Sequence, residues 1–257
     1  MKRYHFLLLT SLIVFIFLSI LFMVRIDLPK IPEYAFFTIE SNHKVFDLRL
    51  HLKKYNIVKK NIVNKQHRFQ EKYAIAKDTN EKKEVLKNAK YYLFKSITDD
   101  ILPYWYDTKW DFNGTTENPR DGTIACGYFI STVLSHAGID TDRYALGRET
   151  AGAVIQTLCK RESIHIVKKN NFQRLFQYLK QQKDGIYILG MDWHIGFIVK
   201  KQNKMRFIHS RKPKHAGVLN EEAEDSPTLK LSNFYMVGNV LDNDRIIQRW
   251  VEKTKVF

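Results

Sequence analysis

Apolar residues recur every three or four positions through much of the chain before residue 183. The clearest example is residues 81–102, EKKEVLKNAKYYLFKSITDDIL, which follow possible N-caps at 78–80 and end before Pro103. Residues 43–77 are charged and more loosely amphipathic, and the spacing returns near 126–137, 148–160 and 170–182. These patterns predict a series of helices.

Short apolar runs with β-branched residues predominate in the rest of the chain. The sequence predicts five strands, SIHIV at 163–167, GIYILG at 185–190, HIGFIV at 194–199, MRFIHS at 205–210 and FYMVGNVL at 234–241. Helices come first and strands that can pair antiparallel follow, so the predicted fold class is α+β.

The N-terminus contains an apolar segment long enough to approach the thickness of a membrane. Residues 6–24, FLLLTSLIVFIFLSILFMV, follow Lys2 and Arg3 and precede no small-residue cleavage site. We expect a signal anchor at 1–30 in the bacterial inner membrane, with the remainder extracytoplasmic; the alternative is secretion after cleavage. Residues 31–100 are then a helical linker and accessory region, and 101–257 the functional domain.

The chain is strongly basic, and this limits the classes of partner that it is expected to bind. Lys and Arg total 42 against 27 Asp and Glu, a formal charge of +15. That excess favours anionic surfaces such as phospholipid head groups or wall polymers, although a solvated basic surface explains it equally well. No basic segment interleaved with aromatics indicates a nucleic-acid groove, so nucleic acid is an unlikely partner.

Cys126 is the candidate nucleophile. It opens the stretch CGYFISTVLSHAG at 126–138, whose apolar stripe can bury against a sheet and fix the helix. In the first turn, backbone N–H groups and the helix dipole favour a thiolate, which predicts a thiol pKa lowered towards neutrality. The same groups can stabilise an oxyanion, and Gly127 adds no side chain to the approach. The alternative is a buried structural cysteine.

Two histidines have the positions expected of partners for such a cysteine. His194 begins HIGFIV and His209 ends MRFIHS, at opposite ends of a predicted β-hairpin. A four-residue KKQN turn pairs Val199 with Lys204, which sets His194 directly opposite His209 on one face. One ring can then orient the other, as the third member of a catalytic triad does.

Other uses of these residues stay open. Cys126 and Cys159 can form a disulfide in an exported chain, although Cys159 fits a core position better. Cys126, His194 and His209 can also bind zinc with His215 or Asp192, but no short paired-ligand spacing supports this. We therefore expect no cofactor.

Three short motifs can be compared with known families: the Cys-Gly-aromatic-Phe start of the helix, His194-Ile-Gly-Phe-Ile-Val and Phe-Ile-His209. Together they resemble the motifs of NlpC-type cell-wall peptidases, a papain-like cysteine hydrolase family. The resemblance covers about residues 104–240. It implies a papain-like fold, with Cys126 as nucleophile, His194 as general base and acid, and His209 orienting His194. It also implies cleavage of an amide or isopeptide bond in peptidoglycan stem peptides.

The aromatic loop before the helix, YWYDTKWDFNGTTENPRDG at 104–122, offers residues for the cleft. Papain-like sites use an upstream polar residue at the oxyanion, and Asn113 is the best candidate, with Trp110 shaping the wall. Asn113 before Gly114 is equally typical of a plain turn. The preferred function is an anchored cysteine hydrolase; the alternatives are a transglutaminase-like acyl transferase and a non-catalytic envelope binding or scaffold protein.

Overall fold

Six antiparallel strands form one sheet in the order β1-β6-β2-β3-β4-β5. The computed structural model describes residues 46–168, 171–212 and 217–256. The strands are β1 (His165–Lys168), β2 (Gly185–Met191), β3 (Ile195–Lys201), β4 (Lys204–Arg211), β5 (Gly217–Glu222) and β6 (Phe234–Asn239). Together with the helices, this confirms the predicted α+β class. β5 has no counterpart in the sequence prediction.

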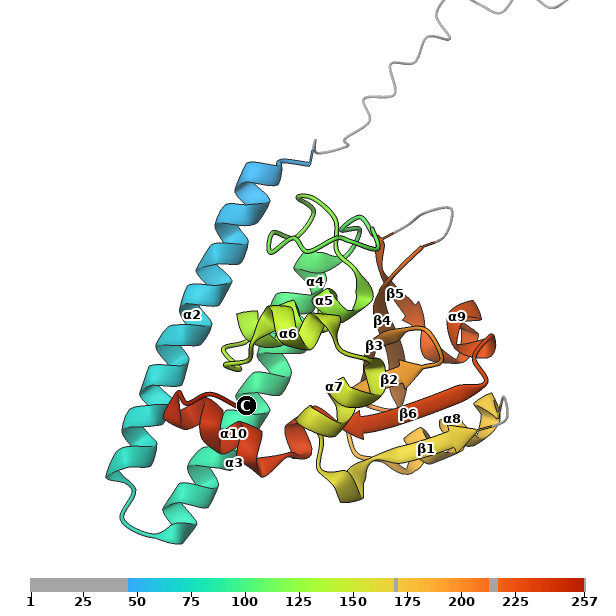
Figure 1. Ribbon diagram of the computed structural model, residues 1–257. Helices are drawn as coiled ribbons and strands as arrows, with labels where there is room; N and C mark the ends of the chain where they lie inside the picture. Colours follow the sequence, from blue (N-terminus) through green and yellow to red (C-terminus); the bar gives the residue numbers. More distant parts are fainter. Residues whose placement is uncertain (1–45, 169–170, 213–216, 257) are drawn as a thin grey trace, which may run out of the picture. The chain divides into compact units, whose positions relative to one another are not determined.

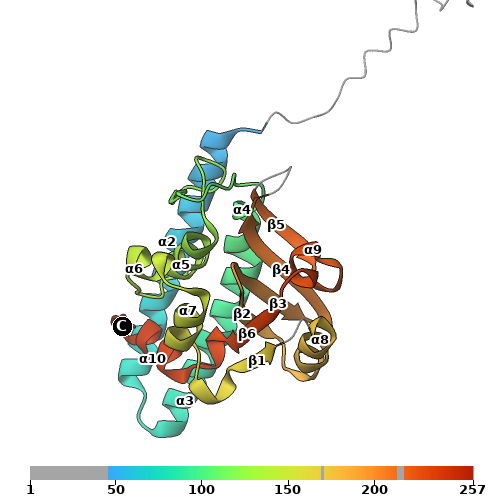
Figure 2. The same ribbon diagram turned by 45° about the vertical axis from the view of Figure 1, so that its right-hand side comes forward.

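Helices cover both faces of the sheet, because the strands bury apolar residues on both sides. In β2, Ile186 and Ile188 belong to the larger core, whereas Tyr187 and Leu189 belong to the smaller one. Figure 2 shows α5 (Cys126–His136) and α7 (Ala151–Leu158) on one side of the strands, and α8 (Phe172–Gln181) and α9 (Pro227–Lys230) on the other.

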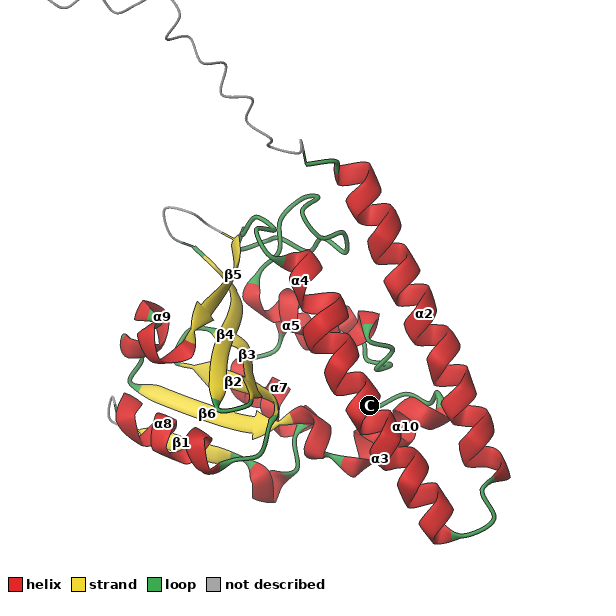
Figure 3. Ribbon diagram, turned by 180° about the vertical axis from the view of Figure 1, so that it is seen from behind, coloured by secondary structure: helices red, strands yellow, loops and turns green. Residues whose placement is uncertain are grey.

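Two long helices precede the sheet and pack as an antiparallel pair (Figures 1 and 3). α2 (Leu48–Ile75) and α3 (Thr79–Lys95) are joined at Asp78, whose carboxylate accepts the amides of Asn80 and Glu81 and so caps α3. A π-helical turn (Ser96–Ile101) and α4 (Leu102–Trp105) follow. The C-terminal helix α10 (Asp244–Glu252) packs on both α2 and α3.

The predicted helix near 148–160 is α7, which Thr150 caps by accepting the amide of Ala153. A short helix before it, α6 (Arg143–Arg148), was not predicted. None of the helices in the described residues is long and apolar enough to cross a membrane. The predicted anchor at 6–24 lies outside those residues.

The β3–β4 turn differs from the four-residue loop predicted for KKQN. Lys201 pairs with Lys204, so the turn has only two residues, Gln202 and Asn203, and both have positive φ. Two-residue hairpin turns of this kind match the twist of the paired strands. Val199 consequently pairs with Arg206 instead of Lys204. The register differs from the predicted one by two residues, so His194 and His209 still lie on the same face of the sheet. They are diagonal neighbours instead of a directly opposed pair.

Lys200 in β3 is almost fully buried and stabilises the end of α8. Its Nζ donates to the carbonyls of Leu179 and Lys180 at 3.0 and 2.7 Å, and to that of Gln182. These are the carbonyls that a helix C-terminus leaves without partners, and a cation is favoured there.

We expect Lys200→Met to lower the free energy of unfolding by about 1–3 kcal/mol, because it removes the hydrogen bonds that a buried ammonium donates to three carbonyls. Denaturant unfolding measures this. The matched control is Lys201→Met, whose ammonium is half exposed and pairs with Asp99; it should cost at most about 1 kcal/mol. Equal losses in the two variants would contradict the capping role of Lys200.

Candidate functional site

Cys126 is the first residue of α5, at a helix end that no side chain caps. Ala125 occupies the N-cap position and has no side-chain acceptor for the first amides. The helix is held rigidly by a buried stripe that includes Phe129, Ile130 and Val133. Unpaired N–H groups therefore surround the sulfur at a well-fixed position.

The predicted drop in the thiol pKa does not occur. Burial raises the pKa of Cys126, and hydrogen bonds from the amides of Ile195, Gly127 and Cys126 itself offset this only in part. The helix-end effect is therefore present, but removing the sulfur from water outweighs it. The Ile195 amide also places the sulfur beside the residue that follows His194.

His194 and His209 are in direct contact. His194 Nε2 lies 2.8 Å from His209 Nδ1, and both side chains are buried. Burial, followed by the His209 and Arg211 charges, lowers the pKa of His194 to about 3. His194 Nδ1 has no protein partner among the described residues, and the Cys126 sulfur forms no hydrogen bond with this ring.

Gly196 makes the diagonal contact between the two rings possible. A Cβ on Gly196 would lie 2.5 Å from Phe207 Cε2 and 2.8 Å from His209 Cβ, closer than real side chains approach. The His209 ring stacks on Phe207 with centroids 4.0 Å apart. The space beside Gly196 is thus filled by the His209 side chain and by Phe207, on which it stacks.

We expect Gly196→Ala to displace His209 from His194 and to lower the free energy of unfolding by about 1–3 kcal/mol through overpacking. Denaturant unfolding and the NMR signals of the two imidazoles measure both effects. Gly152→Ala in α7 is the control, because its Cβ would meet only Met236 Sδ at 3.7 Å. Unperturbed imidazole signals in Gly196→Ala would contradict the packing argument.

Glu221 in β5 extends the histidine pair and was missed in the sequence. Its Oε2 lies 3.3 Å from His209 Nε2, and the Ser226 hydroxyl donates to the same oxygen at 2.6 Å. The hydrogen bond from His209, followed by that from Ser226, lowers the pKa of Glu221 against the effect of burial. This neighbour could have been found only by recognising GVLNEE as a strand that pairs with MRFIHS in the sheet.

Cys126 and His194 line one cleft of about 570 Å³. Its walls come from the loop before α5, the α6–α7 junction and the β2–β3 connection. All the residues predicted to shape it are present: Trp110, Asn113 and Gly127. His209 lies behind His194 and does not line the cleft.

The three predicted cleft residues differ in their surroundings. Asn113 is exposed, and its backbone N–H donates to the Asp111 carboxylate. This contact is typical of the plain turn considered as the alternative. Gly127 is required for close packing and not for access of the substrate. A Cβ added at this position would lie 2.4 Å from the Gly147 carbonyl oxygen. Two further aromatics on the cleft wall are strongly exposed, Phe112 at 78% and Trp193 at 61%.

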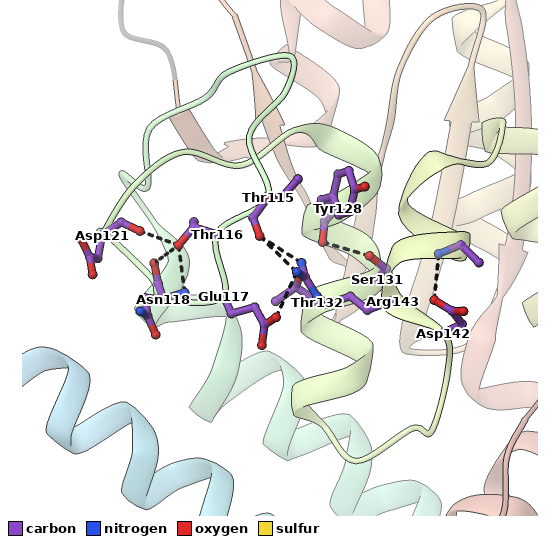
Figure 4. Close-up of polar contacts among 11 residues, drawn as sticks. Thr115, Thr116, Glu117, Asn118, Asp121, Tyr128, Ser131, Thr132, Asp142 and Arg143 are labelled. Carbon is purple, nitrogen blue, oxygen red and sulfur yellow. Dashed lines mark hydrogen bonds and ion pairs between the residues drawn. The ribbon is translucent and has the colours of Figure 1, made fainter.

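Arg143 of α6 ties the cleft loop to the cysteine helix (Figure 4). Its guanidinium donates to the Thr115 carbonyl at 3.2 Å and to the Thr132 hydroxyl at 3.0 Å, and pairs with Glu117 at 3.0 Å. The side chain is only 8% exposed. The loop that carries Trp110 and Asn113 is therefore anchored to the same helix as Cys126.

Glu149 and Asp192 also line the cleft, whereas His136 and Cys159 do not. His136 bonds to the buried Tyr55 hydroxyl at 2.8 Å, and burial lowers its pKa to about 3. Cys126 and Cys159 are both free thiols. Throughout 46–168, 171–212 and 217–256, no three His, Cys, Asp or Glu residues are grouped to hold a metal ion. His215, considered as a zinc ligand, lies outside these ranges.

Comparison of the chain with known protein families, with curated proteins and with solved structures finds no match.

Proposed function

We propose that this protein is a membrane-anchored cysteine hydrolase of NlpC-like, papain-like type. It cleaves an amide or isopeptide bond, and its substrate class is the stem peptide of peptidoglycan. Cys126 is the nucleophile, His194 the general base and acid, and His209 the residue that orients His194.

The observation that carries this proposal is that Cys126, a free thiol at an uncapped helix end, and His194 line the same cleft, and that a second imidazole, that of His209, bonds to the His194 ring. The Ile195 amide contacts the Cys126 sulfur, while the preceding residue, His194, bonds to His209 at 2.8 Å. This is the nucleophile, base and orienting group of a triad. Catalytic hydrogen bonds are often longer in unliganded structures, so the absent sulfur–ring bond is compatible with it.

The resting pair is a neutral thiol and a neutral imidazole. Burial raises the pKa of Cys126 and lowers that of His194 to about 3, so near pH 7 the proton stays on sulfur. As the sulfur attacks the amide carbonyl, His194 Nδ1 takes the thiol proton. A carbon–sulfur bond forms, and the carbonyl electron pair moves to oxygen.

Collapse of this intermediate breaks the carbon–nitrogen bond. His194 returns its proton to the departing nitrogen, the free amine leaves, and a thioester remains on Cys126. A water molecule then gives a proton to His194 and its oxygen to the acyl carbon. The thiolate departs and recovers the proton, which releases a carboxylic acid.

The cleft supplies groups for the oxyanion and for the substrate. The Cys126 and Gly127 amides lie at the sulfur, and such donors typically contribute ~10²–10³ in rate. Asn113 also lines the cleft and can add a side-chain amide. Trp110, with the exposed Phe112 and Trp193, offers flat apolar surfaces to a substrate.

The basic surface fits a location at the bacterial inner membrane, with the predicted anchor at 6–24 and the catalytic domain outside. In α2, Lys and Arg far outnumber the single acidic residue, Glu71. This basic helix favours contact with anionic lipid or wall polymer.

The experiment uses the full chain in detergent with purified peptidoglycan, and it measures newly exposed amino groups. The proposal predicts their release by wild type and not by Cys126→Ala. Transfer of the acyl group to an added amine, without net hydrolysis, would replace hydrolase with acyl transferase. Binding to peptidoglycan with neither reaction would indicate a scaffold and overturn the enzymatic proposal.

A further inference from the structure

The contact between Glu221 and His209 continues the chain of polar groups behind the proposed base, in which the two histidines and Ser226 are buried and Glu221 is partly exposed. From front to back, this chain comprises His194, His209, Glu221 and Ser226, each in contact with the next. We propose that Glu221 is a positioning residue that fixes the ring tautomers of His209 and His194, an inference that rests on the proposed function.

The donors and acceptors along this chain determine which ring nitrogens carry protons. An ionised carboxylate only accepts, so the His209 nitrogen facing Glu221, Nε2, carries the proton. A neutral His209 then has a bare Nδ1, which can only accept. His194 Nε2 must donate to it, and this leaves His194 Nδ1 unprotonated. That is the nitrogen a general base needs, and among the described residues it has no hydrogen-bond partner.

The Ser226 hydroxyl keeps the carboxylate in place. Ser226 is the N-cap of α9 and is almost fully buried, at 1% exposure, and it donates to the Oε2 atom that also accepts from His209. Glu221 itself sits in the β4–β5 ladder opposite Phe207, on which the His209 ring stacks. Strand pairing and α9 therefore both hold the carboxylate against His209.

Charge acts in the same direction as geometry. The charged and titratable groups that influence His209 are Glu221, Arg211 and the His194 ring. Burial and Arg211 disfavour a proton on the pair, whereas Glu221 favours it. Without the carboxylate, the imidazole pair is a weaker base.

Glu221→Gln tests the assignment because the amide keeps the shape and loses the charge. A glutamine can present its NH₂ to His209 Nε2, which reverses the direction of both hydrogen bonds and leaves a proton on His194 Nδ1. Glu222→Gln is the matched control. Glu222 is next in the same strand, pairs with Arg206 on the surface, and loses an equal charge.

The first readout is ¹⁵N NMR of the imidazoles in the full chain labelled at histidine, with signals assigned by single His→Gln variants. Wild type and Glu222→Gln should show a bare Nδ1 and a protonated Nε2 on His194. Glu221→Gln should show Nδ1 protonated in part. The apparent pKa of the coupled pair should also fall in Glu221→Gln and stay unchanged in Glu222→Gln.

The second readout is the rate of amine release. Glu221→Gln should reduce it by about 10- to 100-fold, less than the ~10⁴-fold lost when the carboxylate directly behind a catalytic base is replaced. Thermal unfolding of the two Gln variants tests whether both are folded. A pure stability role would lower the unfolding temperature without altering the tautomers.

The two proposals fail in distinguishable ways. Wild-type protein with the described tautomers but no hydrolysis would remove the proposed function and keep the Glu221 assignment. A protonated His194 Nδ1 in wild type, or identical spectra in wild type and Glu221→Gln, would overturn the assignment even where hydrolysis is observed.

Discussion

Replacing Cys126 with alanine is expected to reduce hydrolysis of the substrate amide by about 10⁴-fold or more, because no other group can form the thioester. Cys126 is only partly buried, and small side chains at the helix start are tolerated, so the fold should persist. The initial rate of amine release from peptidoglycan measures the loss, and far-ultraviolet circular dichroism monitors the fold.

The chain contains its own control for this variant. Cys159, the second free thiol, is buried, and burial raises its pKa to about 12. Cys159→Ala should retain the hydrolytic rate to within a few-fold, with a loss of stability from the vacated volume. A Cys126→Ala protein that hydrolyses at the wild-type rate would eliminate the cysteine as nucleophile.

His194→Gln is expected to cost nearly as much as loss of the thiol. Without an acceptor for its proton, the thiol, whose pKa burial raises, stays protonated and attacks slowly. Because thiol and imidazole act as a unit, the double variant Cys126→Ala, His194→Gln should be no slower than either single variant. Rates of amine release for the three variants form the cycle.

His67→Gln controls for the loss of a histidine. His67 is exposed on α2, its ring bonds to the Lys253 ammonium, and it does not line the cleft. It should retain full activity. Additive losses from the Cys126 and His194 substitutions would show that the two residues contribute independently, and would exclude a shared proton transfer.

Local pattern was sufficient to predict the elements that carry Cys126, His194 and His209. The apolar stripe around Phe129 and Val133 gave one answer only, because a helix is the only regular element that gathers those positions on one face. The alternation in β3 and β4 was equally clear, and it placed the two histidines on a common face for any even turn length.

Register could not be predicted, because it depends on backbone conformation at two residues. Gln202 and Asn203 adopt positive φ, which non-glycine residues rarely do, so KKQN did not suggest a two-residue turn. The shift of two positions turned a direct pair into a diagonal one. Gly196 then provides the room that lets the rings meet.

The acidic end of the polar chain was hidden for a different reason. GVLNEE lacks a strong alternation, and β5 is an edge strand whose polar residues meet solvent on one side. Glu221 becomes a neighbour of His209 only once β5 pairs with β4. Long-range pairing of this kind leaves little trace in a single short segment.

The thiol pKa shows how burial can reverse a local expectation. From sequence alone, the helix end is visible and the depth of the cleft is not. The amides lower the pKa of Cys126 as expected, but burial of the sulfur raises the pKa by more. The mechanism that fits these opposing effects is proton transfer during attack, without a standing ion pair.

The alkylation rate of Cys126 by iodoacetamide near neutral pH, compared with that of Cys159 in the same molecules, tests the central pairing most directly. Peptide mass mapping of wild type and His194→Gln supplies both rates without knowledge of the substrate. The account predicts faster labelling at Cys126 than at Cys159, and a marked slowing at Cys126 alone in His194→Gln. Equal, slow labelling of both cysteines, unchanged by the loss of His194, would contradict it.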